Sequence, residues 1–156
     1  LILASFVEWI VHLLMHRRVL LGKIHYDHHL AAHADGMLWE FLYYVPAAVI
    51  GSAIFFTIAW YTDAWWLAYG LCAGSFVYAF FAGYAHQIQH EHPELVFWMS
   101  PPVHTVHHKH EMYRRNFGIG VDVWDKVFGT YQRVDWTPDP SRRCQRLREY
   151  WKIQWY

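Results

Sequence analysis

Two uncharged stretches decide the fold: residues 41–61, FLYYVPAAVIGSAIFFTIAWY, and residues 64–85, AWWLAYGLCAGSFVYAFFAGYA. An α-helix needs roughly 20 apolar residues to cross the hydrocarbon core of a bilayer, and each stretch is long enough. Only Thr62 and Asp63 separate them, so a tight helical hairpin is expected. The alternative is a pair of buried core helices in a soluble protein, but such helices are seldom this long without a charge. Aromatic residues typical of a membrane interface crowd the turn, namely Trp60, Tyr61, Trp65 and Trp66.

The basic residues predict an orientation for this hairpin. All 13 lysines and arginines lie at or before Lys23 or at or after Lys109. Under the positive-inside rule, both flanks of the hairpin then face the cytoplasm and the turn lies on the other side. Residues 1–15, LILASFVEWIVHLLM, are expected to be the last part of an earlier span that reaches the same face. Because the chain starts inside this apolar run, it is expected to be a core fragment whose first span is truncated.

Composition excludes several classes of protein. Hydrophobic residues make up 55% of the 156 residues and charged residues only 17%, which excludes a disordered or strongly polar protein. Acidic and basic residues balance at 13 each, so a nucleic-acid partner is not expected. The two cysteines, Cys72 and Cys144, form no CxxC pair, and any metal is therefore expected to be held without thiolate.

These features predict an all-α, integral membrane helical bundle. Residues 1–136 would form the hairpin and a cytosolic, histidine-rich helical cap. The second uncharged stretch has small residues at a spacing of four, which would let the membrane helices approach closely. These residues are Gly70 and Gly74, and then Ser75, Ala79 and Gly83. Residues 137–156 would form a basic tail that begins with the breaker TPDP (137–140). Leu147, Tyr150, Trp151 and Trp155 recur there at helical spacing, which predicts an amphipathic helix on an anionic membrane surface; a helix packed on the domain is the alternative.

The most unusual feature is the number of histidines, which is 13. Ten of them form four clusters: HLLMH (His12 and His16), HYDHH (His25, His28 and His29), HQIQH (His86 and His90) and HTVHH (His104, His107 and His108). Spacings of three and four place the rings of each cluster on one face of a helix. Since the hairpin leaves and returns to one membrane face, all ten imidazoles are expected to converge there. Histidines beside membrane segments usually mark function. His33 and His110 are uncertain neighbours of these clusters, and His92 is expected to be a loop residue.

The clusters predict a metal site with two ions. Ten imidazoles exceed the coordination of one first-row metal ion, whereas about five for each of two ions leave an open position on each. Imidazole ligands suit iron, zinc, copper and nickel alike, so they do not identify the metal. Glu8, Asp27 and Glu91 are candidate acceptors that would orient the rings, with a hydrated interfacial residue as the alternative for each.

In this order, the four clusters resemble the histidine boxes of the fatty acid hydroxylase superfamily, which includes sterol desaturases and methyl oxidases. A second stretch supports the resemblance: Asn116-Phe117-Gly118, followed by VWDKVFGTY at residues 123–131, is similar to the family's NxG and WDxxFGTY ending. The resemblance covers roughly residues 5–131.

The resemblance implies a membrane-bound, non-haem di-iron oxygenase. Such an enzyme uses O2 as co-substrate and two electrons from an external donor to hydroxylate or desaturate a lipid C–H bond. Iron is the metal it implies, and zinc can occupy such a site in isolated protein. Its catalytic and metal-binding residues would be the ten clustered histidines: His12, His16, His25, His28, His29, His86, His90, His104, His107 and His108.

The resemblance also implies partners and a location. A basic surface that includes Arg114 and Arg115 would receive an acidic electron carrier of the cytochrome or ferredoxin type, although anchoring to anionic headgroups is a simpler role for these charges. The enzyme would be a multi-pass protein of the bacterial inner membrane or the endoplasmic reticulum, with its site facing the cytoplasm. A fatty acyl, sphingoid, sterol, ether lipid or carotenoid substrate is compatible with the boxes. Hydroxylation of a lipid acyl or related chain is preferred over desaturation.

Two other classes of protein would also cluster histidines. A membrane metal transporter or metal-binding protein would hold ions in transit, but transport sites typically lie near mid-bilayer and these histidines lie at the ends of the spans. A purely structural zinc site needs four ligands rather than ten.

Overall fold

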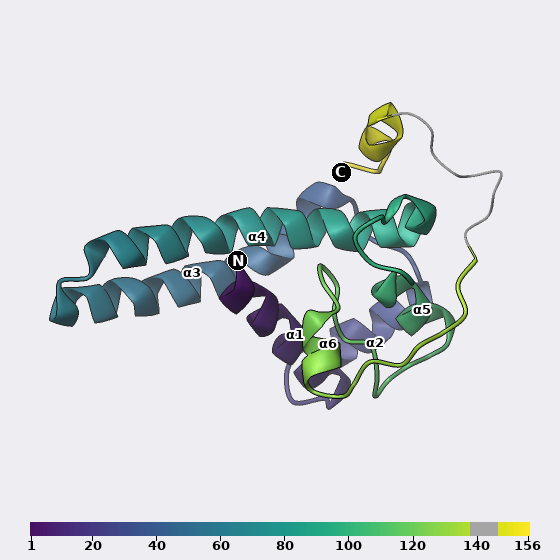
Figure 1. Cartoon of the computed structure of the whole chain (residues 1–156), viewed down its shortest axis with the longest axis horizontal. Helices are drawn as coiled ribbons and strands as arrows, with labels where there is room; N and C mark the ends of the chain where they lie inside the picture. The colour runs from purple at the N-terminus through teal and green to yellow at the C-terminus, as the bar shows by residue number, and fades with distance from the viewer. Residues whose placement is uncertain (138–146) are drawn as a thin grey trace.

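The computed structural model describes residues 1–137 and 147–156, and within these ranges the secondary structure is entirely helical. Figure 1 shows a long hairpin with a group of short helices at the end away from its turn. The elements are α1 (Ile2–His16), α2 (Gly22–Ala31), α3 (Met37–Thr62), α4 (Trp65–Glu91), the 3-10 helix η1 (Pro93–Leu95), α5 (Val103–Lys109), α6 (Val123–Val127) and the 3-10 helix η3 (Leu147–Trp151). The predicted all-helical fold with a hairpin and a histidine-rich region is confirmed.

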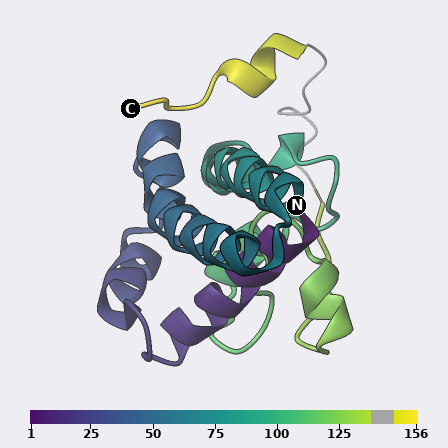
Figure 2. The same ribbon diagram turned by 90° about the vertical axis from the view of Figure 1, so that its left-hand side faces the viewer.

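The hairpin consists of α3 and α4, which lie side by side along most of their length (Figures 1 and 2). Asp63, in the left-handed backbone conformation, ends α3, and α4 begins two residues later. Large apolar side chains cover its outer surface; Trp60 and Trp66 near the turn are 74% and 79% exposed. Both helices are long and apolar enough to cross a membrane.

Close approach of the two helices depends on one of the predicted small residues. A Cβ atom at Gly83 would lie 2.7 Å from the backbone nitrogen of Phe41, so only glycine fits there. A Cβ at Gly70 would meet open space, and one at Gly74 would come no closer than 3.7 Å to the backbone nitrogen of Leu1. The small-residue pattern therefore acts in helix packing at the histidine end of α4 and not at these two positions.

The short helices form a cap at the end of the hairpin. α1 begins beside Gly74 of α4 and runs down to α2, and α5 and α6 lie on the same side (Figures 1 and 2). A hydrophobic core joins the start of α3, the end of α4 and the segment leading into α5, with Met37, Ile88 and Val103 each 2% exposed or less. This core fixes the ends of the elements that carry the third and fourth histidine clusters.

The tail is described only in part. Residues 138–146 of the tail, which include most of the predicted breaker and Cys144, lie outside the described residues. The described part is a 3-10 helix, Leu147–Trp151, followed by a non-helical segment. The carbonyl oxygens of Gln154 and Trp155 accept hydrogen bonds from the backbone N–H groups of Met37 and Leu38, at 2.8 and 2.9 Å. The end of the chain therefore satisfies donors in the first turn of α3, which the α-helical hydrogen-bond pattern leaves free.

Candidate metal centre

All ten clustered histidines come together in the cap. His12 and His16 lie on the last two turns of α1, and His86 and His90 lie near the end of α4. α2 carries His25, His28 and His29, and α5 carries His104, His107 and His108. Four helices from two distant parts of the sequence thus present their rings to one region.

Five of these rings form a first histidine group: His12, His16, His25, His29 and His107, whose ligand nitrogens lie within 4.8 Å of one another. Nε2 of His16 is at the centre, 2.8 Å from Nε2 of His107, 2.9 Å from that of His25 and 3.1 Å from that of His12. Nε2 of His29 lies 3.1 Å from that of His25 and 3.2 Å from that of His107. The group therefore combines nitrogens from α1, α2 and α5.

Four other rings form a second histidine group: His28, His86, His90 and His104, with the same 4.8 Å limit between ligand nitrogens. Nε2 of His86 lies 3.2 Å from that of His28, and Nε2 of His90 lies 3.2 Å from that of His104. The two groups adjoin, since the ring centroids of His12 and His104 are 5.6 Å apart.

His108 belongs to neither group by this criterion. Its ring stacks on that of His29 at a centroid distance of 4.0 Å and lies 4.5 Å from that of His104 and 4.7 Å from that of His90. Both of its nitrogens are buried without a hydrogen-bond partner in the described structure. His108, the tenth predicted ligand, thus lies at the junction of the two histidine groups, and its imidazole has an unused lone pair.

The spacing of the nitrogens fits metal coordination. Two imidazole nitrogens bound to one ion at about 2.1 Å and at right angles lie about 3.0 Å apart. The Nε2–Nε2 distances of 2.8–3.2 Å within the two groups match this nitrogen–nitrogen separation. Hydrogen bonding cannot explain them all, because a neutral imidazole has a single N–H. A cation between the nitrogens satisfies all the lone pairs at once.

The rings are also in the right protonation state to bind a cation. Burial, and then the neighbouring imidazole of His16, lowers the pKa of His29 to about 3. Burial and the neighbouring His86 lower the pKa of His28 to about 4. Burial also holds the pKa of His107 well below its usual value. At neutral pH these rings are neutral, and a neutral imidazole is the form that binds metal.

The Nδ1 atoms of two rings have hydrogen-bond partners that fix their orientation. His12 Nδ1 donates to the carbonyl oxygen of Phe117, and His107 Nδ1 donates to that of Arg115 at 2.8 Å. Because a carbonyl oxygen only accepts, these bonds place the proton on Nδ1 and leave the Nε2 lone pair free. In the second group, a carboxylate oxygen of Glu40 lies 2.6 Å from Nδ1 of His86.

The predicted carboxylate acceptors do not contact the rings. Glu8 binds backbone N–H groups of residues 119 and 120, Asp27 pairs with Lys23 on the surface, and Glu91 accepts from Gln87 and the backbone of Gln154. Their carboxyl groups are instead occupied by these other donors. Glu40 was missed, although an acid directly before an uncharged span is a signal that could have identified it.

The three remaining histidines lie outside both groups. His33 and His110 are exposed, and neither contributes a nitrogen to a group. Nε2 of His92 lies 3.0 Å from the carbonyl oxygen of Lys152, so this residue contacts the tail rather than the metal centre.

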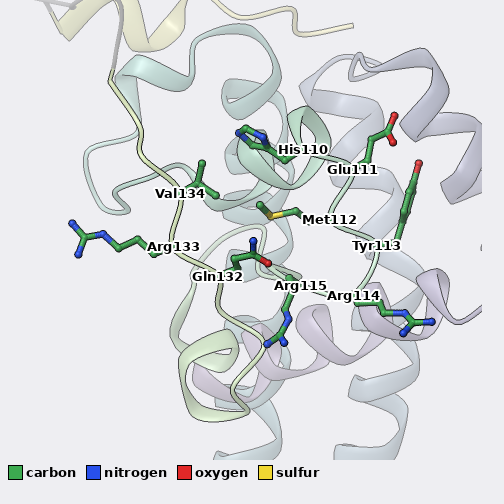
Figure 3. Close-up of a pocket in the computed structure, with 9 residues that line it drawn as sticks. All are labelled: His110, Glu111, Met112, Tyr113, Arg114, Arg115, Gln132, Arg133 and Val134. Atoms are coloured by element: carbon green, nitrogen blue, oxygen red, sulfur yellow. The ribbon is translucent and has the colours of Figure 1, made fainter.

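Two surface openings lie beside the first group. A pocket of about 200 Å³ has His16, His25 and His29 in its lining. A second pocket, of about 630 Å³ and lined by residues 110–115 and 132–134, is shown in Figure 3. Tyr113 borders both, and its ring centroid lies 5.5 Å from that of His29 and 5.8 Å from that of His16. The first group is therefore close to solvent on this side.

Fold and site together define an all-helical protein with an apolar hairpin and, at its end, two adjoining histidine groups able to hold metal ions. The family model for fatty acid hydroxylase matches residues 1–130, and the chain belongs to this family. The match confirms the resemblance carried by the four histidine clusters and the WDKVFGTY segment. No curated protein and no solved structure gives a significant match to the chain.

Proposed function

We propose that the chain is the catalytic core of a di-iron oxygenase that hydroxylates a lipid C–H bond, with desaturation as the alternative outcome. The observation that carries this proposal is the convergence of ten imidazoles, nine of them in two adjoining groups with His108 at the junction, in a chain of the fatty acid hydroxylase family. Family membership supports a lipid hydroxylase or desaturase. The substrate is taken to be a lipid acyl or related chain.

We assign one ion to each histidine group. The first group supplies five nitrogens and the second supplies four, and we assign His108 to the second, whose His90 and His104 rings lie beside it. Iron is proposed as the working metal, and zinc would fit the same nitrogens. When bound, the pair of irons would supply the activation of O2. The protein holds neutral rings with their lone pairs inward and leaves a route from the solvent along the 200 Å³ pocket.

An acidic electron carrier is proposed to dock on the basic surface around the larger pocket. Arg114 and Arg133 extend into solvent on opposite sides of this pocket (Figure 3). Tyr113 lies between this surface and the rings of His16 and His29. Replacing both arginines by glutamate should raise the KM for a cytochrome or ferredoxin donor and leave the metal content unchanged; an unchanged KM would place the donor elsewhere.

We propose a multi-pass location in a bacterial inner membrane or the endoplasmic reticulum, with the metal centre on the cytoplasmic face. The two apolar helices and the absence of lysine and arginine from the sequence between Lys23 and Lys109 support it. A metal transporter fits less well, because the histidine groups lie at one end of the hairpin and not midway along the spans.

The test combines metal analysis with lipid analysis. The purified, fully loaded protein should contain two metal ions per chain. Cells that express the protein should accumulate a lipid heavier by one oxygen atom, or lighter by two hydrogen atoms if the enzyme is a desaturase. His28→Ala and His107→Ala, one in each group, should each abolish turnover while membrane insertion stays intact. Fewer than two metals, or full activity in both variants, would reject the proposal, and bound metal without a lipid product would favour metal handling.

A further inference from the structure

Two buried carboxyl groups outside the metal centre hold a single loop, residues 116–120. The first belongs to Glu8, one turn before His12 on α1 and 5% exposed. Its two oxygens accept hydrogen bonds from the backbone N–H groups of Ile119, at 2.8 Å, and Gly120, at 3.0 Å. The hydroxyl of Tyr78 donates to the same carboxyl group at 2.7 Å.

The second carboxyl group belongs to Asp125 on α6 and is fully buried. Its oxygens accept from the backbone N–H groups of Phe117, at 2.9 Å, and Gly118, at 2.7 Å. The indole of Trp9 and the hydroxyl of Thr130 also donate to it, at 3.1 and 2.6 Å. Within residues 1–137 and 147–156, no lysine or arginine forms an ion pair with Asp125 or Glu8. Burying a carboxyl group is unfavourable unless hydrogen bonds compensate for it, and here four of those bonds come from consecutive loop amides.

The fit of the loop against these carboxyl groups is tight. A Cβ at Gly118 would lie 3.0 Å from Oδ2 of Asp125 and 2.2 Å from the carbonyl oxygen of Val121. A Cβ at Gly120 would lie 2.6 Å from the Tyr78 hydroxyl and 3.1 Å from Oε2 of Glu8. The glycines let the loop backbone reach both carboxyl groups at once.

The loop in turn holds one ring of the first histidine group directly. Phe117, whose N–H donates to Asp125, accepts the Nδ1 proton of His12 with its own carbonyl oxygen. The carbonyl oxygen of Arg115, the residue just before the loop, does the same for His107. In the second group, the corresponding partner of His86 is Glu40, on α3. The two groups are therefore supported by different parts of the chain.

We propose that Asp125 and Glu8 are positioning residues for the first histidine group. By fixing the loop, they set the tautomer and orientation of His12 and the lone pair that it offers to a metal ion, without touching the ion or the ring. This inference rests on the proposed metal centre, and it makes the first group, but not the second, depend on residues 8 and 125.

Asp125→Asn is the sharpest variant, because it keeps the shape of the side chain but replaces one acceptor oxygen by an NH2 group that faces a backbone N–H. In the purified full-length chain titrated with Zn²⁺ against a chelator, the Kd of one of the two sites should rise about 10- to 100-fold, the usual effect of losing an outer partner. His90→Ala removes a ligand of the second group, so the double variant Asp125→Asn/His90→Ala should bind almost no Zn²⁺ tightly. His107→Ala removes a ligand of the first group, so the double variant Asp125→Asn/His107→Ala should keep the one Zn²⁺ ion that His107→Ala alone retains.

Three further variants serve as controls. Glu8→Gln should act on the same site as Asp125→Asn, and it keeps the test open if Asp125→Asn does not fold. Glu40→Gln should weaken the other site, which His86 helps to form. Asp27→Asn removes an exposed pair with Lys23 and should change neither site. Equal weakening of both sites in Asp125→Asn and Glu8→Gln, or no weakening of either, would overturn the proposal.

A second readout does not involve metal. In the metal-free protein labelled with ¹⁵N histidine, the His12 ring, assigned with His12→Ala, should carry its proton on Nδ1. In Asp125→Asn and Glu8→Gln it should become a mixture of tautomers, while the His86 signal stays unchanged. An unchanged His12 signal would overturn the positioning role. If the wild-type protein binds fewer than two Zn²⁺ ions, the proposed two-metal function fails, and the tautomer measurement still decides the role of the two carboxyl groups.

Discussion

His16 shows at the scale of single residues why this cluster suits a metal ion. Its Nε2 atom has Nε2 atoms of three other histidines within 3.1 Å, but it can share only one proton among them. His12 and His107 already use their protons at Nδ1, so both present Nε2 lone pairs to His16, which has at most one proton to offer from its own Nε2. Spacing in the sequence predicted which histidines would meet, and the backbone carbonyls that orient them were visible only in the fold.

The depressed pKa values predict an acid-sensitive cap in the metal-free protein. Above pH 6.5 the imidazoles are neutral in both the folded and the unfolded chain. Below it the unfolded chain binds protons that the folded chain excludes, since the pKa of folded His28 is about 4 and that of His29 about 3. Stability is therefore lost as the pH falls from 6.5 towards these values, by about 1 to 2 kcal/mol per histidine at pH 5 after allowance for partial exposure.

Thermal unfolding followed by circular dichroism checks this expectation. The Tm of chelator-treated protein should fall between pH 7 and pH 5 and stay nearly constant between pH 7 and pH 8. His28→Gln should show a smaller fall. A Tm that rises or stays level on acidification to pH 5 would contradict the expected pKa shifts.

At the scale of elements, the third histidine cluster depends on how α3 and α4 pack. α4 continues beyond the uncharged stretch that ends at Ala85, so His86 and His90 lie in its final turns. Hydropathy could not predict this extension, because the helix continues where its side chains become polar. Gly83 brings the backbone of Phe41, and with it Glu40, close to α4 one turn before His86.

Gly83→Leu should therefore destabilise the protein and weaken the second histidine group. The added side chain would overlap the Phe41 backbone, and overpacking of this kind costs about 1 to 3 kcal/mol. Gly70→Leu is the matched control, since a side chain there meets open space. The Tm and the Zn²⁺ affinity of the second site should both fall in the first variant alone; equal behaviour of the two variants would rule out this packing role.

At the scale of the whole molecule, one end of the hairpin carries every histidine of the two groups. The turn at Asp63 lies at the opposite end, with the exposed aromatic residues Trp60 and Trp66 beside it (Figure 1). If the hairpin crosses a membrane, the metal centre and the turn must face opposite compartments.

Cysteine labelling tests the proposed orientation. In a chain with Cys72 and Cys144 replaced by serine, Asp63→Cys should react with a membrane-impermeant maleimide added outside the cell. Arg17→Cys, just after α1, should react only after the membrane is opened. The reverse pattern would place the metal centre on the outer face, and reaction of both from outside would argue against a spanning hairpin.

The sequence by itself determined the helical hairpin, the four histidine clusters and their convergence, because these follow from local periodicity and from a chain that returns to its starting face. Only the tertiary structure decided how the rings divide into two groups and that His108 lies at their junction. It also placed a carboxylate oxygen of Glu40 beside Nδ1 of His86, and it joined the carboxyl groups of Glu8 and Asp125 to a loop more than a hundred residues from Glu8. Such contacts depend on the directions of side chains on packed helices, which spacing along a single helix does not specify.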